Sequence, residues 1–143
     1  MRTLRNQIIA ISLILLATSI FNCENNDDAD LKARIQINEG PENGDIGGDF
    51  TGNGGDTSGT YTWPNNLSTA DYNADITAPA PSSFNMVIKD ANGNTVLERS
   101  LLGGTEPDSF SGVTQSGTPG TWSVTLTLIN FKGDGSFSIS AEN

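Results

Sequence analysis

The stretch from residue 121 to residue 131, TWSVTLTLINF, has the clearest alternation of apolar and polar side chains in the chain. Its apolar set is Trp122, Val124, Leu126 and Leu128, and its hydroxyl set is Thr121, Ser123, Thr125 and Thr127. A period of two is typical of a β-strand with one face in the core. Ile129 and Phe131 continue the apolar pattern on the opposite parity. We therefore expect a β-bulge or a bend near residues 128–129.

Other alternating segments surround this strand at intervals of about 8–12 residues. Residues 83–89 and 95–102 are joined by residues 90–94, whose Asn-Gly pair favours a tight hairpin turn. Further strands are expected at residues 31–37, 60–63, 71–77, 109–113 and 136–140, with a hairpin turn at 132–135. The expected inward side chains are Leu31, Ala33, Ile35, Ile37, Phe84, Met86, Ile88, Phe137 and Ile139. This pattern predicts an all-β fold, a jelly-roll-like antiparallel β-sandwich of about 7–8 strands.

Residues 38–59 differ from their surroundings because they contain eight glycines and few apolar side chains. Such a segment has little surface to bury against the entropy cost of ordering, which predicts a long Gly/Asp-rich loop. An alternative is a calcium loop, because Asp45, Asp49 and Asp56 are interleaved with glycines, as in glycine-aspartate repeats that bind Ca²⁺.

Tyr61 and Trp63 lie two residues apart, so a strand would direct both side chains to one face. On an outer face they would form a flat platform for a sugar or a peptide. On an inner face they would belong to the core, where large aromatic residues of small sandwiches usually lie.

The composition excludes several classes of function. The chain has 17 acidic and 7 basic residues, a net charge of −10, which disfavours nucleic acid as a partner. Histidine is absent, which removes the Ser-His-Asp triad and the usual zinc ligand. Cys23 is the single cysteine, so no disulfide forms within the chain. We expect no catalytic residues and no enzyme activity, although a pair of carboxylates could in principle hydrolyse a glycoside.

The N-terminus has the order of a secretory signal. Arg2 and Arg5 precede an apolar run at residues 8–20, which is too short to span a bilayer comfortably. The sequence Ile20-Phe21-Asn22-Cys23 then resembles the lipobox of bacterial lipoproteins. The resemblance implies cleavage of residues 1–22, a covalent lipid on Cys23, and a place in the outer membrane or at the cell surface. The alternative is an ordinary signal peptide with a cysteine nearby.

The acidic residues 23–30 are expected to form a tether, followed by a β-sandwich domain at residues 31–143. Two segments of that domain, the strand at residues 120–126 and the hairpin at 84–97, are similar to P-domain-like and prepeptidase C-terminal-like β-sandwiches. The resemblance implies an accessory or binding module; calcium ligands of those families are not carried over.

The sequence as a whole predicts a non-catalytic, lipid-anchored envelope lipoprotein whose β-sandwich binds a protein or glycan ligand, for example in adhesion at the surface. The lipid on Cys23 would attach the protein to the membrane. The alternatives are a calcium- or carbohydrate-binding module and a periplasm-facing accessory subunit of an envelope complex.

Overall fold

The computed structural model describes residues 30–41 and 44–141, and in these residues the chain is all-β, with antiparallel strands and no α-helix. The strands are β1 (Ala33–Glu39), β2 (Ile46–Asn65), β3 (Ala70–Thr77), β4 (Ser83–Lys89), β5 (Thr95–Leu102), β6 (Ser109–Val113) and β7 (Gly120–Ala141). The predicted fold class is confirmed. In this part of the chain there is also no helix long and apolar enough to cross a membrane. The predicted signal peptide, Cys23 and nearly all of the tether lie outside the described residues.

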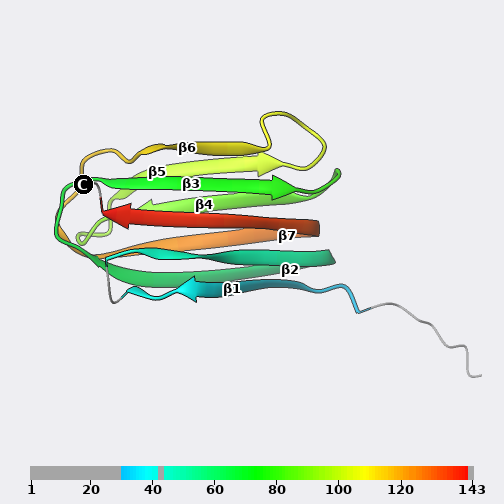
Figure 1. The fold of residues 1–143 in the computed structure, drawn as a ribbon, viewed down its shortest axis with the longest axis horizontal. Coiled ribbons are helices and arrows are strands. Elements are labelled where there is room, and N and C mark those ends of the chain that lie inside the picture. Colours follow the sequence, from blue (N-terminus) through cyan, green and yellow to red (C-terminus); the bar gives the residue numbers. More distant parts are fainter. Residues whose placement is uncertain (1–29, 42–43, 142–143) are drawn as a thin grey trace, which may run out of the picture.

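The fold is organised by β2 and β7, which pair along their whole lengths, from Ile46 opposite Ile139 to Asn65 opposite Gly120. Each of these strands passes from one layer of the sandwich to the other (Figure 1). Layer A contains β6, β3, residues 132–141 of β7, residues 46–53 of β2, and β1. Layer B contains β5, β4, residues 120–128 of β7 and residues 57–65 of β2.

The corner between the layers is made by irregular pairing. The register shifts first between Asn53 and Gly55 and again between Gly55 and Thr57, opposite residues 128–132 of β7. Asn130 takes a positive φ of 48°, a conformation that asparagine tolerates better than most residues, and its backbone N–H donates to Asp56 Oδ1 at 2.6 Å. The predicted bulge near residues 128–129 is confirmed, and it is the point where β7 changes layers.

The prediction of a loop at residues 38–59 is wrong for most of the segment, because residues 38–39 belong to β1 and residues 46–59 belong to β2. The glycines that suggested disorder permit close packing instead. A Cβ on Gly52 would lie 2.2 Å from the carbonyl oxygen of Phe131, so a larger residue would force the two strands apart. The segment also pairs with β1 on one side and β7 on the other, which satisfies its backbone hydrogen bonds.

The predicted hairpin turn at residues 132–135 is also wrong. These residues continue β7 and pair both with β2, where Asp134 faces Thr51, and with β3, where Asp134 faces Thr77. Two neighbouring strands therefore hold this glycine-containing segment extended. The predicted strand at residues 60–63 is the last part of β2.

The remaining strand predictions agree more closely with the structure. The strands at 83–89, 95–102 and 109–113 have the predicted bounds, and β3 begins one residue before the predicted 71–77. The turn at Asp90–Asn94 is present, with Gly93 at a φ of 82°. The first strand begins at Ala33, and Leu31, predicted to face inward, is 62% exposed.

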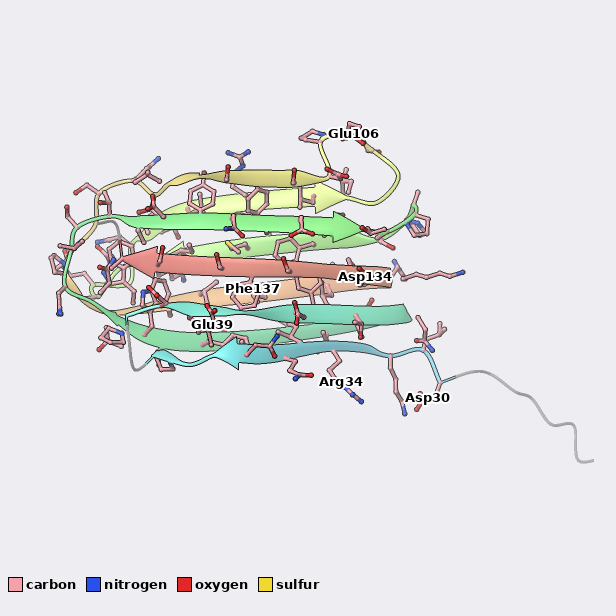
Figure 2. The ribbon with its side chains drawn as sticks, viewed as in Figure 1. Asp30, Arg34, Glu39, Glu106, Asp134 and Phe137 are labelled. Carbon is pink, nitrogen blue, oxygen red and sulfur yellow. The ribbon has the colours of Figure 1, made fainter. Side chains whose placement is uncertain are left out.

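The core lies between the two layers and follows the predicted parity. The fully buried side chains include Phe84, Met86, Ile88, Trp122, Val124, Leu126, Leu128, Phe131, Phe137 and Ile139. Aromatic rings pack at its centre, where Phe50 stacks on Phe84 with ring centroids 4.7 Å apart. Phe137 lies between the layers, whereas charged side chains such as Arg34 and Glu106 lie at the outside (Figure 2).

Candidate functional site

β1 is the strand whose inward face is least covered. β2 and β7 fold over at the corner, so their parts in layer B lie over their parts in layer A. β1 pairs with residues 47–52 of β2 and extends layer A by one strand beyond this overlap. Among the described residues, layer B has no strand opposite β1. Ala33, Ile35 and Ile37 therefore pack against the core but remain half-buried.

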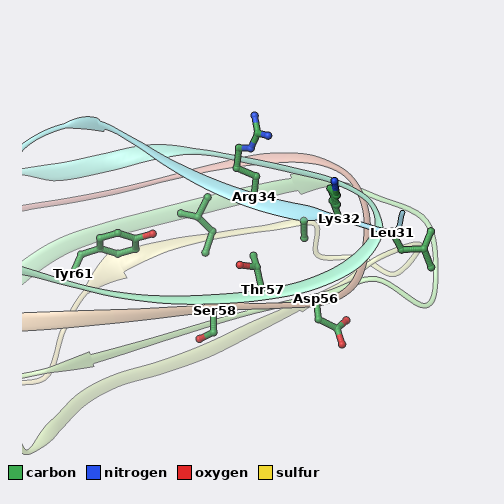
Figure 3. A pocket seen from close by; sticks show the side chains of 9 residues that line it. Leu31, Lys32, Arg34, Asp56, Thr57, Ser58 and Tyr61 are labelled. Atoms are coloured by element: carbon green, nitrogen blue, oxygen red, sulfur yellow. The ribbon is translucent and has the colours of Figure 1, made fainter. Parts of the chain in front are cut away.

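A groove of about 330 Å³ follows this uncovered edge. One wall is formed by residues 31–35 at the start of β1, and the other by Asp56, Thr57, Ser58 and Tyr61 of β2 (Figure 3). The volume lies at the lower end of the range for ligand pockets, about 300–1,000 Å³. Thr57 and Tyr61 point into the groove, whereas the side chains of Arg34, Asp56 and Ser58 point away from it, toward the outside of the sandwich (Figure 3).

Tyr61 is the aromatic residue of the groove. Its ring lies over Gly59, because a Cβ added at Gly59 would be 2.5 Å from the Tyr61 hydroxyl and about 2.9 Å from the ring carbon that bears it. Within the described part of the chain, no hydrogen bond engages the Tyr61 hydroxyl. The half-buried ring and its hydroxyl are therefore both available at the groove.

The charged residues at the rim differ in the ion pairs and hydrogen bonds that they form. Lys32 forms an ion pair with Asp30 at 2.6 Å, and both side chains are mostly exposed. Asp56 accepts the backbone hydrogen bond of Asn130 at the corner. Arg34 has no ion pair or hydrogen bond of its guanidinium within residues 30–41 and 44–141. Arg34 is thus an unengaged cation on the outer face of β1, beside the groove.

The three aspartates predicted for calcium are not brought together. Asp45 precedes β2, Asp49 lies within the first part of β2, and Asp56 lies at the corner. The four residue steps from Asp49 to Asn53 already span about 13 Å along β2, before the corner at which Asp56 lies. Calcium ligands, by contrast, lie about 2.3–2.6 Å from the ion they share. Among the described residues no group of three or more Asp, Glu, His or Cys could hold a metal ion. Asp56 lines the groove, and Asp49 accepts a hydrogen bond from Asn38 instead.

The prediction of a Tyr61/Trp63 platform is wrong for Trp63, and the core interpretation is right. Trp63 is 1% exposed, and its ring meets that of Trp122 edge-on, with centroids 6.0 Å apart. The two residues do share a face, as their spacing predicted, but that face is the inner one. Within the described chain the Trp63 Nε1 is buried without a hydrogen-bond partner. Tyr61 alone reaches the groove.

Asp90 is the carboxylate whose protonation the fold changes most clearly. The backbone N–H of Thr118 donates to its Oδ2 at 2.9 Å, and those of Asn94 and Asn92 donate to Oδ1 at 2.8 and 3.0 Å. These bonds, that of Thr118 first, lower the pKa of Asp90 from 3.8 to about 2, against the opposing effect of burial. The side chain joins the β4–β5 turn to the β6–β7 loop, which is a structural role.

The sequence contained part of the signal for this groove. The alternation at residues 31–37 and the pair at 61 and 63 identified inward faces correctly. The missing information was that no strand of layer B would cover β1, which depends on how β2 folds over. Ala33, Ile35 and Thr57 were therefore not predicted as site residues.

No known protein-family profile matches the sequence, and no curated protein matches it. Among solved structures, the chain is similar to TmCBM61, which was determined in complex with beta-1,4-galactotriose. The two are 8% identical with a TM-score of 0.45, and the match covers 78% of this chain and 70% of that chain. A likeness at this level carries no argument about a ligand.

Proposed function

We propose that this chain is a non-catalytic, lipid-anchored protein of the bacterial cell envelope whose β-sandwich binds a ligand or partner in the groove between β1 and β2. The observation that carries the proposal is the uncovered inner face of β1 beside Tyr61. Half-exposed apolar side chains flanked by polar groups are characteristic of binding sites. Most of the remaining inner side chains of the described strands are buried.

The chemistry of the groove favours binding over catalysis. Of the described residues that line it, Asp56 alone is acidic, and its carboxylate already accepts a backbone hydrogen bond. A glycosidase needs two carboxylates about 5–9.5 Å apart across the scissile bond. The residue with a clearly shifted pKa, Asp90, is used to hold two loops together. These features support a module that holds its partner without reacting with it.

The anchor is proposed from the N-terminal sequence. The basic residues Arg2 and Arg5, the apolar run at 8–20 and the lipobox-like Ile20–Cys23 support cleavage before Cys23 and lipidation of its thiol. Lipid chains contribute about 0.8 kcal/mol per buried CH₂, so two or more chains would hold the protein at a membrane durably. The proposed location is the outer membrane, with the domain facing outward.

The anchor is tested by growing cells with an alkyne-bearing palmitate and detecting the label on the protein. We expect labelling of the natural chain and none of Cys23→Ser. Protease treatment of intact cells then tests the outward orientation: rapid loss is expected, whereas loss after lysis alone would indicate the periplasm-facing alternative. Equal labelling of both chains would contradict lipidation at Cys23.

The binding site is tested with a photo-cross-linking amino acid in place of Thr57, which lines the groove and has the inward parity of Tyr61. We expect cross-linked adducts in cells, and their loss when Tyr61→Ala is added. The matched control places the same amino acid at Val87, on the outer face of layer B. Adducts of equal yield from both positions would mean that the groove is not the site.

A glycan is the second candidate for the ligand, and Tyr61 favours it, since a half-exposed aromatic ring beside hydroxyl and cationic groups can stack on a sugar. An oligosaccharide array read with the natural chain and with Tyr61→Ala tests this. Because the three predicted aspartates lie apart, we expect millimolar calcium to leave the melting temperature unchanged.

A further inference from the structure

At the edge of layer B formed by residues 57–63 of β2, the usual protection of an exposed strand edge is confined to the two ends, at the register shift before Thr57 and at Pro64. Natural proteins guard edges with charges, prolines, bulges or very short strands. The described edge strands elsewhere follow this rule: β1 carries Arg34, β5 carries Glu98 and Arg99, and β6 is 5 residues long. Residues 57–63 (TSGTYTW) carry no charged side chain. Their outward backbone groups have no strand partner in the described chain.

We propose that an extended segment of another polypeptide adds as a strand to residues 57–63 of β2, and that it occupies the position in layer B opposite β1. This rests on the proposed binding function of the groove and names its partner class. A strand paired with β2 lies about 4.8 Å from it, and stacked sheets lie about 10 Å apart, which places the added strand over the inward face of β1. Ala33, Ile35 and Tyr61 would then become buried.

The surroundings define the chemistry of the added strand. Its inward side chains, at alternate positions, are apolar, because they meet Ala33 and Ile35. Its outward side chains are small hydroxyl residues, because they continue hydrogen-bonded rows in which Ser58 meets Thr127 at 3.1 Å and Thr60 meets Thr125 at 2.9 Å. Backbone hydrogen bonds to the β2 edge provide affinity, and the alternate pockets provide selectivity.

Charge complementarity adds an acidic residue to this description. The chain after Cys23 has five cationic side chains, and two of them, Lys32 and Arg34, lie at the rim of this groove in a strongly acidic protein. Arg34 is free of ion pairs among the described residues. Because Arg34 points to the outer face of β1, an acidic residue at the end of the added strand would be attracted by the positive charge of this rim without a direct ion pair.

A second copy of this chain fits this position poorly. In a symmetric pair joined through residues 57–63, the β1 of each molecule would project over the other's β2, where that molecule's own layer A already lies. The acidic segment 24–30 (ENNDDAD) of the same chain has alanine as its one apolar residue, so it cannot supply alternate apolar side chains. The position therefore suits one strand of a different polypeptide.

The test uses a synthetic nine-residue peptide with glutamate at both ends and valine and threonine alternating between them, titrated calorimetrically into the full chain. We expect saturable binding, with slowed amide hydrogen exchange at residues 57–63 of β2. A peptide of the same sequence with N-methylated amides at alternate positions is the control, and it should not bind. Equal binding of the two peptides would overturn strand addition, because backbone pairing would not be involved.

Two variants locate the site. Ile35→Glu should weaken binding by about tenfold or more, because the added strand would bury an unpaired carboxylate. Leu97→Glu places the same change at a half-buried position of β5, on the opposite edge, and should leave binding unaltered. If a cross-linking amino acid at position 57 captures a partner but the peptide does not bind, strand addition is overturned while the binding function stands. Oligosaccharide binding without peptide binding, or a concentration-dependent dimer that Ile35→Glu abolishes, would overturn it as well.

Discussion

The two long edges of the sandwich are built differently. At the β5–β6 edge, the guanidinium of Arg99 in layer B lies 5.3 Å from the centre of the Phe110 ring in layer A, so one side chain spans the layers. Phe110 is 7% exposed as a result of this cover and of its contact with Tyr72. At the β1–β2 edge no described side chain spans the layers in this way, and the groove remains.

The loop before β7 strengthens the closed edge further. The backbone N–H of Gln115 donates to the Val96 carbonyl at 3.0 Å, and that of Thr118 donates to Asp90. Layer A and layer B are therefore joined both by a side chain and by a loop on this side. A sandwich whose layers match in width closes at its edge, and one extra strand in one layer leaves a groove.

The largest expected effect separates the two aromatic residues near the open edge. Trp63→Ala should lower the free energy of unfolding by about 3–5 kcal/mol, since it removes a fully buried ring from its contact with Trp122. Tyr61→Ala should lower it by about 1 kcal/mol, the usual cost outside a fully packed core. Urea unfolding followed by circular dichroism measures both. Equal losses would mean that Tyr61 belongs to the core and that the groove is closed.

Trp63→Phe is the control for this pair. It keeps an aromatic ring against Trp122 and removes the indole N–H, which is buried without a partner in the described chain. Since removing an unsatisfied buried donor relieves a desolvation cost, its effect should be much smaller than that of alanine.

The next effect concerns the place where β1 joins layer A. Gly52 faces Ala33 of β1 on one side and Gly133 of β7 on the other. Gly52→Ala should lower the free energy of unfolding by about 1–3 kcal/mol, because its Cβ would lie 2.2 Å from the Phe131 carbonyl oxygen. Gly40→Ala, which meets no atom within 4 Å, is the matched control and should change stability by less than about 0.5 kcal/mol. Thermal unfolding compares them, and equal stability would contradict the close approach at Gly52.

The strands differ in how well the sequence predicts them. The strands at residues 83–89, 95–102 and 109–113 were predicted with their bounds because each alternates locally and ends at a turn. The strand at residues 46–59 was not predicted. Its glycines are favourable only because β1 and β7 pack closely on both sides of it, whereas the local sequence shows only that glycine weakens a strand. The hairpin turn predicted at residues 132–135 was wrong for the same reason.

The candidate site, too, could be predicted from the sequence only in part. The parity of Tyr61 and Trp63 was predictable from their spacing, and so was the inward face of β1. The number of strands in each layer was not, because it depends on how β2 and β7 turn the corner. The exposure of Tyr61 and Ile35 follows from that number and from no local pattern.

The closed edge should be sensitive to acid, because the loop before β7 is hydrogen-bonded to Asp90. The folded chain lowers the pKa of Asp90 to about 2 from 3.8, so the unfolded chain binds its proton first as the pH falls. The stabilisation is therefore present above pH 3.8 and is lost as the pH falls from 3.8 toward 2. Asp90→Asn should remove this step from a plot of melting temperature against pH. Asp108→Asn, at an exposed loop position, is the control and should keep the step.

The smallest expected effect comes from the side chain that closes the β5–β6 edge. Arg99→Ala should lower the free energy of unfolding by about 0.5–1 kcal/mol, the usual contribution of a cation–π contact at an exposed site. It should also speed amide hydrogen exchange in β6, because the cover over Phe110 is removed. Arg34→Ala on the open edge contacts no ring and should stay within about 0.5 kcal/mol of the natural chain. If the two arginine variants were equally stable and exchanged alike, Arg99 would not close its edge, and the contrast between the edges would rest on the loop at residues 114–118 alone.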